Sequence, residues 1–184
     1  MPTPDASLNL SVLLRNDPSE YEVAGSGELT PVNGRLAELG LELASPLSWE
    51  LTARSTGGDD DFILEGSVSG TASMECRRCL EPTEVSASTS FIYPMIYRPN
   101  TAGLSLIELD DDNEDTLVFG QPEVDFSDLL LQVFTIDLPL TALCKENCKG
   151  LSADGVNLNE HPDQVSQEEA AQESPFAVLK DLEL

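Results

Sequence analysis

FILEGSVSGTASMEC (residues 62–76) and EVSASTSFIYPMIY (84–97) decide the expected fold, because both read as β-strands. Each combines apolar or alternating runs with glycine, proline and small polar residues, a pattern typical of strands. LNLSVLL (8–14), YEVAGSGEL (21–29) and ELGLELASPLSWELTARS (38–55) show the same pattern. The sequence therefore predicts a mainly β fold of the α+β class, either an antiparallel sheet or an open, barrel-like β domain.

The stretch TGGDDD (56–61) separates two of these strands. Its glycines and aspartates are typical of a hairpin connection. We therefore expect the flanking segments around Trp49 and Ile63 to pair.

VDFSDLLLQVFTIDLPL (124–140) changes the period to that of a helix. Its apolar residues fall on one helical stripe: Phe126, Leu129, Leu130, Val133 and Phe134. Asp125 is expected to be the N-cap, and Pro139 to end the helix. This helix is predicted to cover one face of the sheet.

The length of 184 residues suits one ordinary domain with a tail. Residues 1–160 are predicted to form a single β-rich domain that contains both cysteine pairs, and 161–184 a flexible acidic tail. In SPFAVLKDLEL (174–184) the apolar residues Phe176, Leu179 and Leu182 share one helical face. A short amphipathic C-terminal helix is expected there, which either docks on its own core or enters a partner's groove.

The chain carries 34 acidic and nine basic side chains, giving a formal net charge of -25. A broad face laid along phosphates would be repelled. The charge suits a protein that meets basic partners, one that touches RNA through a local basic spot, or simply a very soluble protein. The start lacks a secretory signal, and no apolar stretch reaches the ~20 residues that span a bilayer. We expect a cytoplasmic protein without a membrane partner.

Two cysteine pairs carry the candidate chemistry: Cys76 with Cys79, and Cys144 with Cys148. Four thiolates can close a tetrahedral zinc site, which points to a structural ion. Cys79 and Cys144 are 144 - 79 = 65 positions apart, so the fold must assemble such a site. Reduced cysteines without metal remain an alternative, as does redox or disulfide chemistry, although the chain lacks a thioredoxin-like alternation of strand and helix.

Four of the nine basic residues lie beside these cysteines: Arg77, Arg78, Lys145 and Lys149. One interpretation is that they offset the charge of the thiolates. The other is that they form the one place where this acidic chain grips RNA or another partner. Both interpretations are compatible.

The sequence does not favour an enzyme. It contains no phosphate-binding loop of the Walker type and no H-E-x-x-H, and its one histidine, His161, lies in the polar tail. Carboxylates are so numerous that no acid/base pair stands out. We expect no catalytic residues and no small-molecule substrate.

Several segments together resemble the YceD family of bacterial and plastid large-ribosomal-RNA-subunit accumulation proteins. They are CRRCLEP (76–82), the helical segment 124–140, CKENCKGL (144–151) with GVNLNE (155–160), and PFAVL (175–179). The resemblance implies a non-enzymatic role in accumulation or processing of large-subunit (23S) ribosomal RNA, with that RNA or its precursor particle as partner. The alternative is an acidic chaperone or interaction module for a basic ribosomal protein, without direct RNA contact.

The chain departs from the family pattern after its second cysteine pair. Relatives often read G-L-C-P-x-C-G there, whereas this chain has GLSADG (150–155), with Ser152 and no further cysteine. This excludes a self-contained second zinc knuckle. The long-range site made by both pairs remains.

Overall fold

The structure is a computed structural model, and it describes residues 6–15, 21–30, 41–57, 60–108 and 115–164. The expected C-terminal helix, with Phe176, Leu179 and Leu182, lies outside these residues. The chain divides into two compact units. We call Met1–Met74 with Glu84–Leu140 the sheet unit, and Glu75–Thr83 with Thr141–Leu184 the knuckle unit. The predicted extent of one domain over residues 1–160, followed by a tail, stays a prediction.

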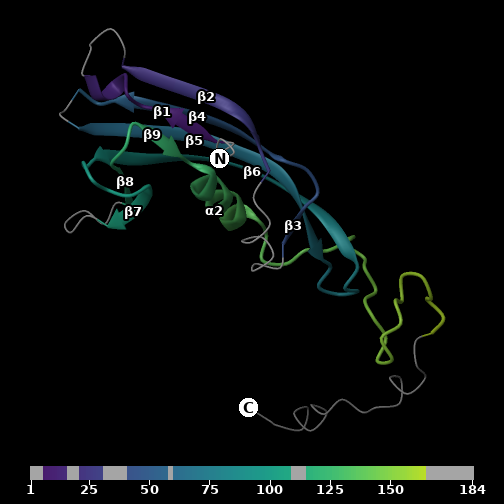
Figure 1. Cartoon of the computed structure of the whole chain (residues 1–184). Coiled ribbons are helices and arrows are strands. Elements are labelled where there is room, and N and C mark those ends of the chain that lie inside the picture. Colours follow the sequence, from purple (N-terminus) through teal and green to yellow (C-terminus); the bar gives the residue numbers. More distant parts are fainter. Residues whose placement is uncertain (1–5, 16–20, 31–40, 58–59, 109–114, 165–184) are drawn as a thin grey trace, which may run out of the picture. The chain divides into compact units, whose positions relative to one another are not determined.

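The predicted mainly β fold is confirmed, and of its two expected forms the described residues adopt the mainly antiparallel sheet, which does not close into a barrel (Figure 1). Its strands are, in order across the sheet, β2 (Glu22–Leu29), β4 (Leu47–Ser55), β5 (Asp61–Glu75), β6 (Pro82–Tyr97), β8 (Asp115–Phe119) and β7 (Leu104–Glu108). The short β3 (Glu42–Leu43) also pairs with β5. A second, two-stranded sheet joins β1 (Ser7–Asn9) to β9 (Glu123–Asp125).

The hairpin predicted around TGGDDD is confirmed. Strands β4 and β5 pair antiparallel, with Ser55 opposite Phe62 and Trp49 opposite Val68. Along β4 the odd-numbered side chains from Leu47 to Ala53 are buried, whereas Ser48 and Glu50 are exposed. This period of two gives the sheet one apolar face and one polar face.

Glycines on the apolar face make room for large side chains. A Cβ atom at Gly66 would lie 2.5 Å from the ring of Phe91, and one at Gly70 would lie 2.4 Å from a methyl group of Leu47. Neither distance is sterically possible without movement. The interruptions of the strand pattern by glycine therefore reflect packing between neighbouring strands.

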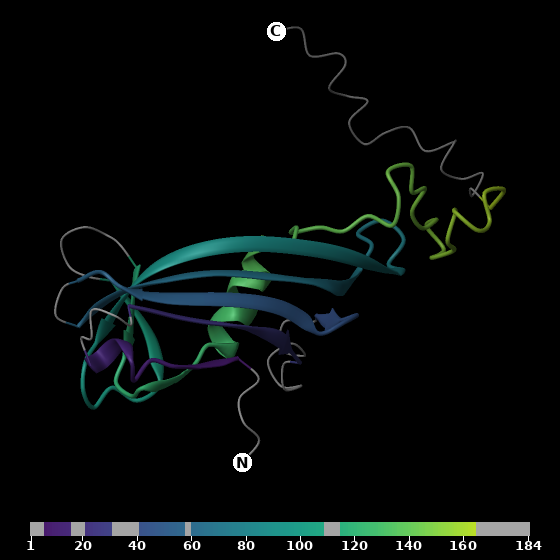
Figure 2. The same cartoon turned by 90° about the horizontal axis from the view of Figure 1, so that it is seen from above.

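Helix α2 (Ser127–Asp137) packs along the apolar face of the sheet (Figure 2). Its buried residues include the whole predicted stripe from 129 to 134 and add Leu131. The N-cap is Phe126 rather than Asp125, because Asp125 still belongs to β9; its carboxylate accepts a hydrogen bond from the Ser127 N–H at 2.9 Å. Leu138 is extended and Pro139 follows, so the helix ends where predicted.

Strands β7 and β8 were not expected from the sequence. They flank the acidic segment ELDDDNED (108–115), whose residues 109–114 lie outside the described part. Thr116, Leu117, Val118 and Phe119 are buried, and β8 pairs in parallel with β6 through Met95 and Leu117. The sheet is therefore mixed at this edge.

The first expected strand, LNLSVLL, is much shorter than its pattern. The strand stops at Asn9, whose side-chain oxygen accepts a hydrogen bond from the Ser11 N–H at 3.0 Å, and a 3-10 helix η1 follows at Leu13–Arg15. Such an asparagine turn competes with strand pairing. No helix in the described residues is long and apolar enough to cross a membrane.

Candidate metal centre

The first cysteine pair lies in a tight turn between the end of β5 and the start of β6. The Leu80 N–H donates to the Cys76 carbonyl at 2.8 Å, and the Cys76 N–H donates to the Glu81 carbonyl at 2.8 Å. Leu80 has a φ of 61°, in the left-handed region that few side chains adopt. This turn places both thiols on one loop.

The second pair follows the end of the sheet unit. The Cys148 N–H donates to the Lys145 carbonyl at 3.1 Å, which folds residues 144–148 into a turn. The Arg77 N–H donates to the Ala142 carbonyl at 3.0 Å, and Cys76 forms an isolated bridge with Ala142. Backbone hydrogen bonds therefore bring together two turns that are distant in sequence.

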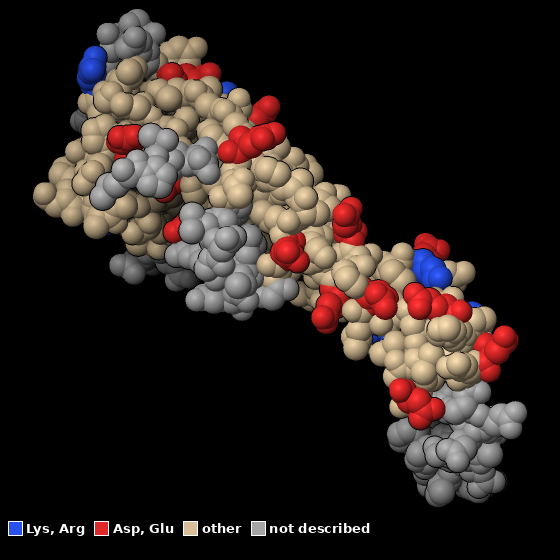
Figure 3. All heavy atoms as spheres, turned by 45° about the vertical axis from the view of Figure 1, so that its right-hand side comes forward, with Lys and Arg blue, Asp and Glu red and all other residues tan. Residues whose placement is uncertain are grey.

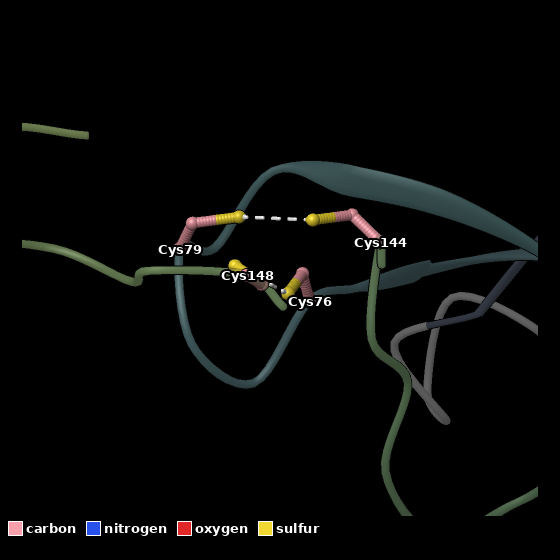
Figure 4. Close-up of side chains that lie close together, drawn as sticks. All are labelled: Cys76, Cys79, Cys144 and Cys148. Carbon is pink, nitrogen blue, oxygen red and sulfur yellow. Dashed lines mark hydrogen bonds between the residues drawn. The ribbon is translucent and has the colours of Figure 1, made fainter. Parts of the chain in front are cut away.

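The sulfur atoms of the four cysteines form one cluster, as Figure 4 shows. They lie within 4.8 Å of one another, with 3.7 Å between Cys79 and Cys144 and 3.9 Å between Cys76 and Cys148. Sulfurs about 2.3 Å from a tetrahedral ion are about 3.8 Å apart. None of the four cysteines is in a disulfide. The donor set and its spacing fit one thiolate-bound metal ion.

Two of the thiols are arranged to ionise readily. Backbone N–H groups, first that of Cys144 and then those of Cys79 and Arg78, lower the pKa of Cys76 to about 6. For Cys148 the pKa is lowered first by the side-chain amide of Asn159. N–H groups aimed at sulfur stabilise the thiolate, which is the form that binds metal.

The other two thiols are harder to ionise in the absence of a cation. At Cys79 the Glu81 N–H favours the thiolate, but burial and the neighbouring Cys76 outweigh it and raise the pKa. Cys144 as a residue is exposed, yet its sulfur faces the cluster; loss of hydration there, and then Cys148, raise its pKa to about 12. Four thiolates therefore need a bound cation to exist together.

The two arginines differ in what they contact. One guanidinium nitrogen of Arg78 donates to the carbonyls of Glu146 at 3.2 Å and Cys148 at 3.0 Å, and so holds the second turn. Arg77 is exposed and makes one long contact, 3.4 Å, to the Thr141 hydroxyl. Among the described residues, no ion pair involves Arg77, Lys145 or Lys149. A binding role for any of these cations stays a prediction.

The segment after the second turn also contributes to the site, which the sequence did not reveal. The amide nitrogen of Asn159 lies 3.2 Å from the Cys148 sulfur. The segment GVNLNE contributed to the family resemblance, but its spacing did not indicate that Asn159 faces a sulfur. Ser152 is buried, and its hydroxyl accepts a hydrogen bond from the Val156 N–H at 3.1 Å. Ser152 thus closes a turn.

Comparison with known proteins places this site in a family. The family model described as large ribosomal RNA subunit accumulation protein YceD matches residues 64–183, more than half of the chain. An uncharacterized protein of Mycobacterium leprae is 26% identical over 128 residues, which is 65% of this chain and 54% of the relative. The chain thus spans about half the length of that relative. No solved structure matches the chain.

Proposed function

Since this chain belongs to the YceD family, we propose that it is a non-enzymatic ribosome-biogenesis factor that supports accumulation or processing of 23S ribosomal RNA in the cytoplasm. The observation that carries the proposal is the family match over residues 64–183, which includes both cysteine turns and helix α2. The partner is large-subunit ribosomal RNA or its precursor particle. The match also includes Phe176, Leu179 and Leu182, which we propose to contact an assembly partner.

We further propose that Cys76, Cys79, Cys144 and Cys148 hold one structural zinc ion. Four sulfur ligands fill a tetrahedral coordination shell, so no position is left for water or substrate. Catalytic zinc sites keep such a position open. The near match of 3.7 and 3.9 Å to the sulfur spacing of a zinc–thiolate site supports this proposal.

The distribution of charged side chains favours an RNA contact limited to a few cations of the knuckle unit. Acidic side chains are scattered over the face shown in Figure 3, where basic ones are few. In the described sheet unit Arg54 is already paired with Glu22 at 2.7 Å and Glu65 at 3.4 Å. Arg77, Lys145 and Lys149 are exposed cations of the knuckle unit. Arg78 beside them is exposed as well. With about two to four contacts, RNA affinity should fall only shallowly with salt.

Depletion in cells tests the proposed function. We expect loss of 23S relative to 16S ribosomal RNA, and fewer large subunits in sucrose gradients. Crosslinking then distinguishes the partner: contacts to 23S RNA or its precursor support the RNA interpretation. Contacts to basic ribosomal proteins alone would instead indicate a chaperone, which the net charge of -25 would suit. An unchanged 23S level after depletion would contradict the proposal.

A further inference from the structure

Asn159 uses both ends of its side-chain amide in the knuckle unit. Its oxygen accepts a hydrogen bond from the Lys149 N–H at 2.9 Å. Its nitrogen lies 3.2 Å from the Cys148 sulfur and 2.9 Å from the side-chain oxygen of Asn157. One side chain thus connects the second cysteine turn to the segment that follows it.

The chemistry of the neighbours fixes which way this amide points. A backbone N–H can only donate, so Lys149 requires the Asn159 oxygen on its side. The Asn157 oxygen also accepts the Asn159 backbone N–H at 3.0 Å, so it faces the donor end of the same amide. A flipped amide would set its oxygen against Cys148 sulfur and against another oxygen. The N–H group must therefore face the sulfur.

Backbone hydrogen bonds hold this segment in place independently of the Asn159 side chain. The Leu151 N–H donates to the Arg78 carbonyl at 3.1 Å, and the Leu158 N–H donates to the Gly150 carbonyl at 2.9 Å. Gly150 has a φ of 78°, and a Cβ atom there would lie 3.1 Å from the Arg78 carbonyl oxygen. These backbone bonds do not involve the Asn159 side chain. That side chain can therefore hydrogen-bond to the sulfur, and it can be substituted without removing them.

We propose that Asn159 is a positioning residue of the metal centre: it orients the Cys148 sulfur and draws negative charge from it, which slows loss of the ion. This rests on the proposed metal site. Four thiolates around one divalent ion carry two net negative charges, so an N–H donor at one sulfur stabilises the complex. Groups that hydrogen-bond to metal ligands typically change metal affinity by about 10- to 100-fold.

Two substitutions separate this role from a purely structural one. Asn159→Asp keeps an oxygen acceptor for the Lys149 N–H but puts a carboxylate oxygen beside the sulfur and the Asn157 side-chain oxygen, so the cobalt band is the readout specific to the sulfur. Asn159→Ala removes all three side-chain hydrogen bonds, those to Lys149, Cys148 and Asn157. If Asn159 only supports the Lys149 backbone, the aspartate should behave like the parent. If its N–H group stabilises the sulfur, zinc loss from the aspartate variant should be at least as fast as from the alanine variant.

Asn147→Asp is the matched control. Asn147 is exposed within the second cysteine turn, and this change adds the same charge to the same unit. Circular dichroism of each full-length variant reports folding. Among the described residues, no hydrogen bond joins Asn147 to a cysteine sulfur, so Asn147→Asp controls for the added charge.

The experiment loads the full-length chains with Co²⁺ for spectroscopy and with Zn²⁺ for transfer to excess chelator. We expect Asn159→Asp to shift the thiolate-to-cobalt absorption band and to speed zinc loss by about tenfold, with Asn147→Asp within about twofold of the parent. A parent that binds both ions, with Asn159→Asp matching it in band position and release rate, overturns the role of Asn159 alone. A parent that binds neither ion overturns the metal site as well.

Discussion

The sheet unit and the knuckle unit are each stabilised by a different kind of interaction. The sheet unit buries a large apolar cluster, which includes Trp49, Phe119 and Phe134. The buried cluster of the described knuckle unit consists of three cysteines, with only Leu151 packed against it. Segments with so little apolar burial usually need a disulfide or a metal. From this contrast we expect the knuckle unit to depend on the proposed ion and the sheet unit to be stable without it.

The largest expected effect follows from removing one ligand of the knuckle unit. Cys76→Ser should abolish metal binding and unfold the knuckle unit, because structural zinc sites contribute about 10 kcal/mol or more to folding. Hydrogen exchange should show lost protection in residues 141–164 while β4 and β5 of the sheet unit stay protected. Simultaneous loss of protection in both units would contradict the separation.

A core substitution should have the opposite pattern. Phe134 is buried on α2, so Phe134→Ala should destabilise the sheet unit by about 3–5 kcal/mol. Chemical denaturation measures the change, and metal analysis of the folded variant should still find one ion per chain. Ile136→Ala is the control, because Ile136 is 82% exposed on the same helix. A loss of metal in Phe134→Ala at temperatures where it is folded would show that the two units are coupled.

The two neighbouring arginines should separate stability from binding. Arg78→Gln removes two contacts to backbone carbonyls of the second turn and should cost the knuckle unit about 1–2 kcal/mol, seen as faster zinc loss. Arg77→Gln should leave zinc retention unchanged and weaken RNA binding a few-fold. Equal effects of both substitutions on zinc retention, with no effect on RNA binding, would rule out recognition by Arg77.

The smallest effect on stability is expected at the C-terminus. Deletion of residues 174–184 removes Phe176, Leu179 and Leu182 and should leave the melting temperature nearly unchanged while reducing recovery of the protein with assembly particles. Melting curves and gradient sedimentation measure the two quantities. A loss of about 2–5 kcal/mol would show instead that these apolar side chains pack on the folded protein.

The regular alternation of strands such as β4 made the sheet predictable, and the apolar stripe from Leu129 to Phe134 made α2 predictable. Strands β7 and β8 were missed because each is only five residues long and borders an acidic run. Their place also depends on parallel pairing of β8 with β6, which no local pattern encodes.

The cysteines were predictable as a donor set because residue type and pairing are visible in the sequence. The different contacts of Arg77 and Arg78 could not be predicted, because the two residues are adjacent and of the same type. Only the folded turn directs Arg78 toward the carbonyls of residues 146 and 148. Asn159 was missed for the same reason. Its hydrogen bond to the Cys148 sulfur joins residues 11 positions apart and depends on how the loop between them closes.

Native mass spectrometry of chelator-free protein most directly tests whether the four cysteines form one structural zinc site. We expect one zinc ion per chain in the parent, none after Cys76→Ser, and loss of the folded knuckle unit with the ion. A parent purified without zinc, or a Cys76→Ser variant that retains a full equivalent, would contradict this expectation.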